Sequence, residues 1–116
     1  MSLGSARAVR IIAAAGMAAA ALGASAQALD DKGADELMDK YFCSGCHQID
    51  KKMVGPGFRD VAKKYAGDAA ASAQLAARVR NGGQGVWGPV AMPANAKIPD
   101  ADLRALMGWI LALPQI

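Results

Sequence analysis

Both cysteines of this chain and its single histidine stand within one pentapeptide, Cys43-Ser44-Gly45-Cys46-His47. Thiol and imidazole groups bind transition metals and take part in redox chemistry. The spacing C-x-x-C-H is the attachment signature of c-type haem. Two thiols three positions apart can reach the two vinyl groups on one porphyrin edge, and the next imidazole then points at the iron. The pentapeptide therefore predicts one haem c, covalent through Cys43 and Cys46, with His47 as an iron ligand.

The same cysteines are compatible with other sites. Cys43 and Cys46 could form a structural disulfide in an oxidising compartment. A thioredoxin-like redox pair usually lies at a strand-to-helix turn, and this sequence has no strand-like alternation. A zinc site needs a second pair of ligands, and the chain has only two Cys and one His. Without haem, the chain would be a bare helical redox or interaction module.

A second protein ligand to the iron cannot be another histidine, because the chain has one. A methionine, a lysine or an open site remain. The methionines beyond residue 28 are Met38, Met53, Met92 and Met107. Met38 and Met107 fall on apolar helix faces, and Met53 is expected to pack near the attachment site. Met92 precedes Pro93, which restricts the backbone of the residue before it, so we predict Met92 as the distal ligand.

The first 28 residues have the features of a secretory signal peptide. Arg7 and Arg10 precede a short apolar run, and the small residues Ala26 and Ala28 fit the cleavage rule, with Ala24-Ser25-Ala26 as a second possible site. The apolar run is shorter than the ~18–20 residues of a spanning helix, which would be the alternative. We expect a cleaved signal peptide over residues 1–28, Sec export to the periplasm, and one domain over residues 29–116.

The charge of the chain argues against a nucleic-acid partner. Its formal net charge is +3, from 13 basic and 10 acidic residues, and two of the basic ones lie in the predicted signal peptide. The other 11 (13 minus 2) nearly balance the 10 acidic residues, which is no footprint for nucleic acid. A length of 116 residues with 53% hydrophobic content indicates one small domain, and we expect a monomer.

Four segments have the periodicity of amphipathic helices, with apolar residues at i, i+3, i+4 and i+7. They run from Asp31 to Phe42 with Asp30 or Asp31 as cap, from Phe58 to Tyr65, from Ala69 to Arg80, and from a cap at Asp100 to Leu111. The expected core faces carry Ala34, Leu37, Met38, Tyr41, Phe58, Val61, Ala62, Tyr65, Leu75, Ala76, Val79, Leu103, Leu106, Met107, Ile110 and Leu111.

Two long irregular stretches separate these helices, Ser44 to Gly57 and Gly82 to Pro99. Loops of this length in a small domain usually carry function or are disordered. A domain of this size buries only about 60% of its unfolded surface. Because the helices are rich in Ala, a large apolar cofactor would supply the missing core volume.

Three segments in this order, CSGCH, MVGPGF and NGGQGVWGPVAMPAN, resemble the class I c-type cytochromes, specifically the small bacterial cytochrome c-551 (c8) type. The resemblance covers nearly all of residues 31–114. It implies an all-α fold of four helices around one covalent haem. It also implies a periplasmic single-electron carrier, cycling between Fe(III) and Fe(II), in respiration or denitrification. The implied redox partners are nitrite reductase, a terminal oxidase or a quinol:cytochrome c reductase.

The resemblance assigns roles to further residues. The carbonyl of Pro56 accepts a hydrogen bond from the proximal imidazole. Trp87 hydrogen-bonds a haem propionate, unless it only packs. Arg78 pairs with a propionate, unless it is a solvated helix charge. The amide of Asn95 contacts the ligand sulfur, and Trp109 packs the last helix on the first.

Some positions depart from the pattern of that family. Ala91 and Ala94 stand near the ligand methionine where many relatives have prolines. Phe42 is bulkier than the residue expected before the first cysteine. The apolar tail Pro114-Gln115-Ile116 has no assigned role.

The resemblance also implies an exposed haem edge where electrons leave. Its apolar rim would consist of Val54, Gly55, Pro89, Val90, Ala91 and Pro93. Lys51, Lys52 and Lys97 would form a positive border that steers an acidic partner, unless they only solvate the surface.

A hexacoordinate iron has no free position, so we expect an electron carrier and not an enzyme. The alternative is a haem peroxidase or a gas-sensing haem protein with a labile Met ligand. Catalysis there would call for a distal acid or base, and the chain has no second histidine to provide it.

Overall fold

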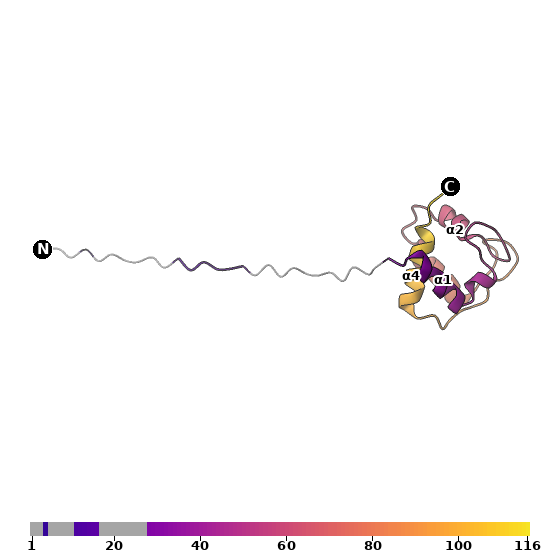
Figure 1. The fold of residues 1–116 in the computed structure, drawn as a ribbon, viewed down its shortest axis with the longest axis horizontal. Helices are drawn as coiled ribbons and strands as arrows, with labels where there is room; N and C mark the ends of the chain where they lie inside the picture. Colours follow the sequence, from indigo (N-terminus) through magenta and orange to yellow (C-terminus); the bar gives the residue numbers. More distant parts are fainter. Residues whose placement is uncertain (1–3, 5–10, 17–27) are drawn as a thin grey trace.

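The computed structural model describes residues 4, 11–16 and 28–116 (Figure 1). The described residues form α1 (Asp31–Lys40), the 3-10 helix η1 (Cys43–Gly45), α2 (Phe58–Lys64), α3 (Ala71–Asn81) and α4 (Asp100–Leu111). These residues contain no β-strand, and an isolated bridge pairs Gly83 with Met92. The all-α fold expected from the sequence is confirmed. In the same residues, no helix has the length and apolarity to cross a bilayer.

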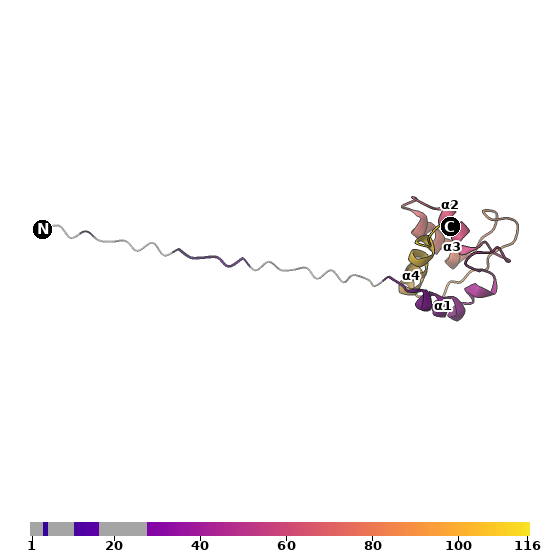
Figure 2. The ribbon, with the colours of Figure 1, turned by 45° about the horizontal axis from the view of Figure 1, so that its top comes forward.

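Helix α4 is the centre of the packing. Each of α1, α2 and α3 contacts it, and Figure 2 shows the helices grouped around it with the long loops on the other side of the domain. The buried stripe of α4 consists of Leu103, Leu106, Met107 and Ile110. The other helices bury Ala34, Met38, Phe58, Val61, Ala62, Ala71 and Leu75. Each large apolar side chain in this set stabilises the fold by about 1.5–3 kcal/mol. The apolar periodicity predicted all of these residues except Ala71, and it also missed Ile98 of the second long loop.

Helix α1 ends two residues before its periodicity predicts. Asp30 caps its start, because the carboxylate accepts the N–H of Gly33 at 2.7 Å. The helix ends at Lys40, Tyr41 is its C-cap, and Phe42 has a left-handed φ of 62°. Because a left-handed residue cannot continue an α-helix, the chain turns here into η1, which carries the first cysteine.

Two predicted helix starts are wrong. Helix α3 begins at Ala71 rather than Ala69, because the carboxylate of Asp68 accepts the N–H of Ala70 at 2.9 Å and holds a turn before the helix. Asp100 does not cap α4. Pro99 occupies the capping position, and Asp100 is the first helical residue, with its carboxylate paired to an arginine of α3.

Each long loop is anchored by an arginine. The His47 loop (residues 44–57) is tied to α2 and the C-terminal tail, because Arg59 binds the carboxylate of Asp50 and the carbonyl of Pro114. The Met92 loop (residues 82–99) is tied to α3, because Arg80 binds the carbonyl of Ala96 and the carboxylate of Asp100. The loops are irregular in backbone but fixed to the helices.

The predicted signal peptide falls largely outside the described residues. Of residues 1–28, the structure describes 4, 11–16 and 28. Ile11 and Ile12 are 87% and 88% exposed, so this part of the apolar run does not belong to the core.

Candidate functional site

A cavity of about 650 Å³ opens between the helices and both loops. Its lining includes every residue that the sequence analysis assigned to the site: Cys43, Cys46, His47, Pro56, Arg78, Trp87, Met92 and Asn95. The core side chains Phe58, Leu75 and Ile98 form apolar parts of its wall. The volume lies within the range of about 300–1,000 Å³ that is usual for ligand and cofactor sites.

The two cysteines line the cavity from η1 and the residue after it. Both are free, so no disulfide joins them. Burial raises the pKa of the Cys43 thiol, whereas a redox-active dithiol needs a lowered pKa. In the part of the chain that the structure describes, no group of three or more His, Cys, Asp or Glu side chains could hold a metal ion. The Cys43 thiol therefore lacks the activation of a redox-active cysteine.

Three neighbours fix the imidazole of His47. Its Nδ1 lies 2.8 Å from the carbonyl oxygen of Pro56, which can only accept, so Nδ1 donates. The ring stacks on Phe58 with centroids 4.9 Å apart and planes 17° apart. A Cβ on Gly55 would lie 2.5 Å from Cε1, so only glycine fits against the ring. Because Nδ1 is engaged, Nε2 is the nitrogen left to bind a metal.

Met92 is held by its backbone. Its N–H donates to the carbonyl of Gly83 at 2.8 Å, and its carbonyl accepts the N–H of Gly83 at 3.1 Å. Gly82, the C-cap of α3, has a φ of 72°, and a Cβ there would lie 2.7 Å from the Met92 carbonyl oxygen. Only glycine fits both the turn and this close approach, so Gly82 fixes where Met92 meets the cavity.

The other methionines have different surroundings. Met38 and Met107 also line the cavity, but they are helical core residues with exposures of 4% and 5%. Met53 also lines the cavity, but its side chain is 42% exposed. Met53 and Met92 are therefore the two thioethers of the loops that border the cavity.

Asn95 connects the Met92 loop to two helices. Its backbone N–H donates to the carbonyl of Val79 at 2.8 Å, and its side-chain Nδ2 donates to the carbonyl of Tyr41 at 3.3 Å. An amide nitrogen carries two N–H groups, so a second donor remains for a group in the cavity. The hydroxyl of Tyr41 donates to Asp102 of α4 at 2.5 Å, and this hydrogen bond raises the pKa of Tyr41.

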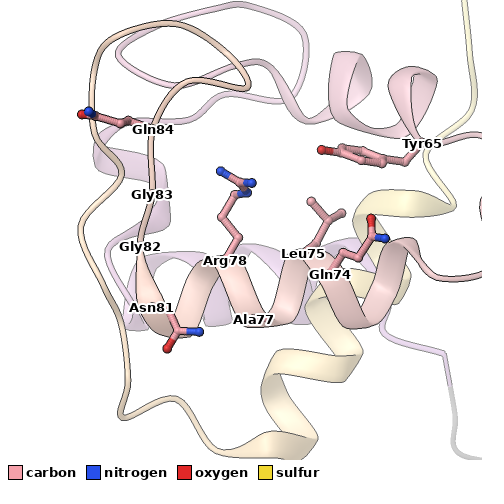
Figure 3. Close-up of a pocket in the computed structure, with 9 residues that line it drawn as sticks. All are labelled: Tyr65, Gln74, Leu75, Ala77, Arg78, Asn81, Gly82, Gly83 and Gln84. Atoms are coloured by element: carbon pink, nitrogen blue, oxygen red, sulfur yellow. The ribbon is translucent and has the colours of Figure 1, made fainter.

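Arg78 lies between the cavity and a second, open groove of about 590 Å³, and it lines both. Figure 3 shows its side chain rising from α3 into the space between Tyr65 and Gln84. Its Nη1 lies against the Met92 loop, 3.0 Å from where a Cβ on Gly83 would be. A guanidinium in this place suits the carboxylate groups of a ligand.

Trp87 comes from the Met92 loop and is half-buried at the cavity wall. The ammonium of Lys64 lies 5.4 Å from its ring centroid, a cation–π distance. The indole therefore packs between α2 and the cavity, and its N–H is a hydrogen-bond donor at the wall.

The chemistry of the donor set fits a covalent haem. Two thiols, a free imidazole nitrogen and several methionine side chains, Met92 among them, border one largely apolar cavity. Thiols, imidazole and thioether are the groups that attach and ligate haem c. Gly55 lies where a Cβ would displace the imidazole from its place at the cavity. The site thus carries both the attachment groups and the space that a large apolar cofactor needs.

Several contributors to this site were missed from the sequence. Phe58 was assigned only to the core and Gly55 only to the rim, although both contact His47. The segment GPGF, which follows soon after the histidine, is the sequence signal that could have identified both residues. The bond between Tyr41 and Asp102 spans 61 positions, and no local pattern announces it.

Exposed apolar side chains gather at the cavity mouth. Val54 and Val90, both on the predicted rim, are 55% and 61% exposed. Phe42, Met53 and Val86 are also exposed and also line the cavity. Elsewhere in the described residues, large exposed apolar side chains occur only near the chain ends, at Ile11, Ile12 and Ile116. Such a concentration of apolar surface is typical of an interaction site.

Comparison with known proteins gives consistent relatives. A model of the cytochrome c family matches residues 31–114. Cytochrome c-551 of Allochromatium vinosum is 52% identical over 77 residues, covering 66% of this chain and 82% of that protein. Cytochrome c-551 of Pseudomonas aeruginosa is 54% identical over 70 residues, covering 60% of this chain and 66% of that protein. The crystal structure of wild-type Nitrosomonas europaea cytochrome c552 has a TM-score of 0.66 at 44% identity, covering 69% of this chain and 99% of that one.

Proposed function

Because this chain belongs to the cytochrome c family, and is therefore an electron carrier with one covalently bound haem c and not an enzyme, we propose that His47 and Met92 ligate its iron and that it works in the periplasm. The main observation in support of this ligation is the fixed position of the His47 imidazole. Pro56, Phe58 and Gly55 hold the ring so that Nε2 alone is left for a metal, in a cavity that Met92 also lines.

When bound, haem supplies one iron that cycles between Fe(III) and Fe(II). The hydrogen bond from Nδ1 of His47 to Pro56 fixes the tautomer and makes the imidazole a better donor. The thioether of Met92 would favour the ferrous form and raise the reduction potential. The apolar wall would limit water and act in the same direction. Because His47 and Met92 are already held by hydrogen bonds, little would need to move when the iron changes oxidation state, which suits rapid electron transfer.

Arg78, Trp87 and Asn95 complete the proposed site. Arg78 and Trp87 would hold the haem propionates, which places the charged edge of the cofactor beside the open groove on α3. Asn95 would use its second amide N–H toward the sulfur of Met92, because the first is directed at Tyr41. These assignments rest on the lining of the cavity and on the resemblance of the surrounding motif.

The exposed apolar side chains at the cavity mouth support a docking face for a redox partner. The proposed face includes Val54, Gly55, Pro89, Val90, Ala91 and Pro93, all of which line the cavity. Lys51, Lys52 and Lys97 are exposed and would attract an acidic partner. The partner classes we propose are nitrite reductase, a terminal oxidase or a quinol:cytochrome c reductase. Changing the three lysines to Gln should flatten the salt dependence of electron transfer, and an unchanged dependence would exclude steering.

The periplasmic location is supported by the features of residues 1–28. A positive start, an apolar run and small residues at the predicted cut are typical of a Sec signal peptide. Mass spectrometry of the exported protein should show a first residue at Leu29 or Gln27. A mature chain that retains the arginines would contradict cleavage.

Covalent attachment is tested on the exported protein after denaturation. Haem should stay with the polypeptide in wild type and be extracted from the C43A/C46A variant, since the thioether bonds would be missing. A colourless but folded wild-type chain, from a host able to mature c-type haem, would contradict the proposal. Failure of the reduced protein to bind carbon monoxide would separate the carrier from a gas-sensing protein with a labile methionine.

A further inference from the structure

One residue links three parts of the molecule that are distant in sequence. Tyr41 is the C-cap of α1, and its carbonyl accepts the side-chain amide of Asn95 in the Met92 loop at 3.3 Å. Its hydroxyl donates to the carboxylate of Asp102 on α4 at 2.5 Å. Tyr41 is thus held at both ends, by α4 at the ring and by the Met92 loop at the backbone.

The carbonyl of Tyr41 determines how the Asn95 amide is turned. The backbone of Asn95 is fixed independently, because its N–H donates to Val79 of α3 at 2.8 Å. With the backbone fixed and one side-chain N–H directed at Tyr41, the second N–H has a defined direction. Asn95 and Met92 line the same cavity three positions apart, so this direction decides whether the amide can reach the thioether.

We propose that Tyr41 and Asp102 act as a positioning pair for the methionine side of the site. The pair holds the Tyr41 carbonyl in place, the carbonyl orients Asn95, and Asn95 steadies the sulfur of Met92. The inference rests on the proposed ligation by Met92. It adds two residues that lie outside the haem-binding motif and that act through a third.

The pair is suited to this task by its surroundings. The Tyr41 ring is half-buried against the core, which limits its movement. The ammonium of Lys40 lies 5.4 Å from the ring centroid. The bond to Asp102 joins α1 to α4, the helix on which the rest of the domain packs. A shift of the Met92 loop would therefore disturb its link to α4 through Tyr41 as well as its hydrogen bond to Val79 of α3.

The test measures how readily Met92 dissociates from the iron in the holoprotein. Exogenous imidazole binds ferric iron once the methionine leaves, so its binding rate reports the opening of the Met92 loop. In Y41F and D102A, which each remove the hydrogen bond between Tyr41 and Asp102, the rate should rise about 3- to 10-fold. Tyr65 is a matched control, because it is the C-cap of α2 with nearly the same backbone angles as Tyr41. Y65F, and D35N on the exposed face of α1, should leave the rate within about twofold of wild type.

A double-variant experiment separates positioning from general stability. If the pair acts through Asn95, Y41F should add nothing in an N95A background. If Y41F merely loosens the fold, its effect will persist in N95A, and that result overturns the proposal. An imidazole rate in Y41F equal to that of wild type also overturns it. D102A keeps the tyrosine ring but removes the acceptor of its hydroxyl, so it supplies the measurement if Y41F folds poorly.

The M92A variant distinguishes failure of this inference from failure of the proposed function. If M92A and wild type bind imidazole equally fast, Met92 is not the ligand, and both the ligation and the positioning pair are excluded. If M92A binds much faster than wild type while Y41F does not, the ligation stands and only the positioning pair is excluded.

Discussion

The His47 loop and the Met92 loop hold their proposed ligands in different ways. Every contact that fixes the imidazole comes from its own loop or the first residue of α2, through Gly55, Pro56 and Phe58. The Met92 loop has contacts of its own, because Met92 pairs with Gly83, but it also depends on distant helices. Its Asn95 is held by Val79 of α3 and by Tyr41 at the end of α1. Local sequence thus forms the histidine side, whereas the methionine side also needs the packing of several helices.

This difference indicates which side opens first. Contacts between residues close in sequence need little chain ordering, whereas contacts between distant helices are lost when any of those helices shifts. We therefore expect the imidazole to stay in place under conditions that already release Met92. Replacement of Met92 by an added ligand, release of Met92 at alkaline pH, and partial unfolding should all begin in the Met92 loop.

The largest effect is expected for G82A. The substitution forces a left-handed φ of 72° on a residue with a side chain and sets its Cβ 2.7 Å from the Met92 carbonyl. Strain and overpacking together should cost about 2–5 kcal/mol of unfolding free energy. Urea unfolding of the holoprotein gives this cost, and the weak far-red sulfur-to-iron band should be lost while the imidazole remains bound.

Gly67 provides the control for that prediction. It has a φ of 76° with nothing within 4 Å of a Cβ, so G67A adds strain without a clash. It should cost only about 1–2 kcal/mol and keep the sulfur-to-iron band. Equal effects of G82A and G67A would show that the close approach to Met92 has no consequence.

A smaller but more local effect is expected for G55A. Its Cβ would lie 2.5 Å from Cε1 and 2.8 Å from Nδ1 of His47, so the ring must shift, which disturbs the hydrogen bond from Nδ1 to Pro56. We expect a loss of about 1–3 kcal/mol and a lower yield of low-spin holoprotein. G45A, where a Cβ meets nothing within 4 Å, should behave as wild type. A normal yield and spectrum of G55A would contradict the assigned place of the imidazole.

The stacking of His47 on Phe58 should contribute less. F58L keeps most of the buried volume but removes the aromatic face that lies 4.9 Å from the imidazole centroid. The expected loss is about 0.5–1.5 kcal/mol of unfolding free energy. F42L changes an aromatic residue that is 86% exposed, so it should change stability by less than about 0.5 kcal/mol. If both variants unfold alike, the stack does not stabilise the histidine side.

The smallest effect concerns pH. The hydrogen bond to Asp102 raises the pKa of Tyr41 in the folded protein above its unfolded value. The folded state therefore holds this proton more tightly, so the bond stabilises the fold below a pH of about 10 and is lost as the pH rises through the folded pKa. The difference in unfolding free energy between wild type and Y41F should be constant near neutral pH and shrink in alkali. A difference that grows with pH would have the wrong sign.

The parts of the structure that were predictable depend on local pattern. The periodicity of Leu103, Leu106, Met107 and Ile110 identified the stripe of α4, because burial follows the helical repeat. Helix ends were less certain, because side chains compete for the same backbone groups. Asp100 has the chemistry of a cap, but Arg80 binds its carboxylate instead. Competition of this kind depends on which helices meet, and that information is not local.

The same distinction holds within the site. The pentapeptide and the residues around Met92 are contiguous motifs, and all of their assigned members line the cavity. The bond between Tyr41 and Asp102 joins residues 61 positions apart, and neither stands in a motif. Gly55 and Phe58 follow the pentapeptide closely in the sequence, but their contacts with the imidazole of His47 appear only in the folded chain.

The central claim is that one thioether, that of Met92, ligates the iron of a haem whose other ligand is His47. The most direct measurement compares the reduction potential and the far-red sulfur-to-iron band of wild type, M92A and M53A. Met53 is the matched control, because it also lines the cavity from a loop. M92A should lose the band and have a lower potential, whereas M53A should keep the wild-type band and potential. A band that survives in M92A and disappears in M53A would contradict it.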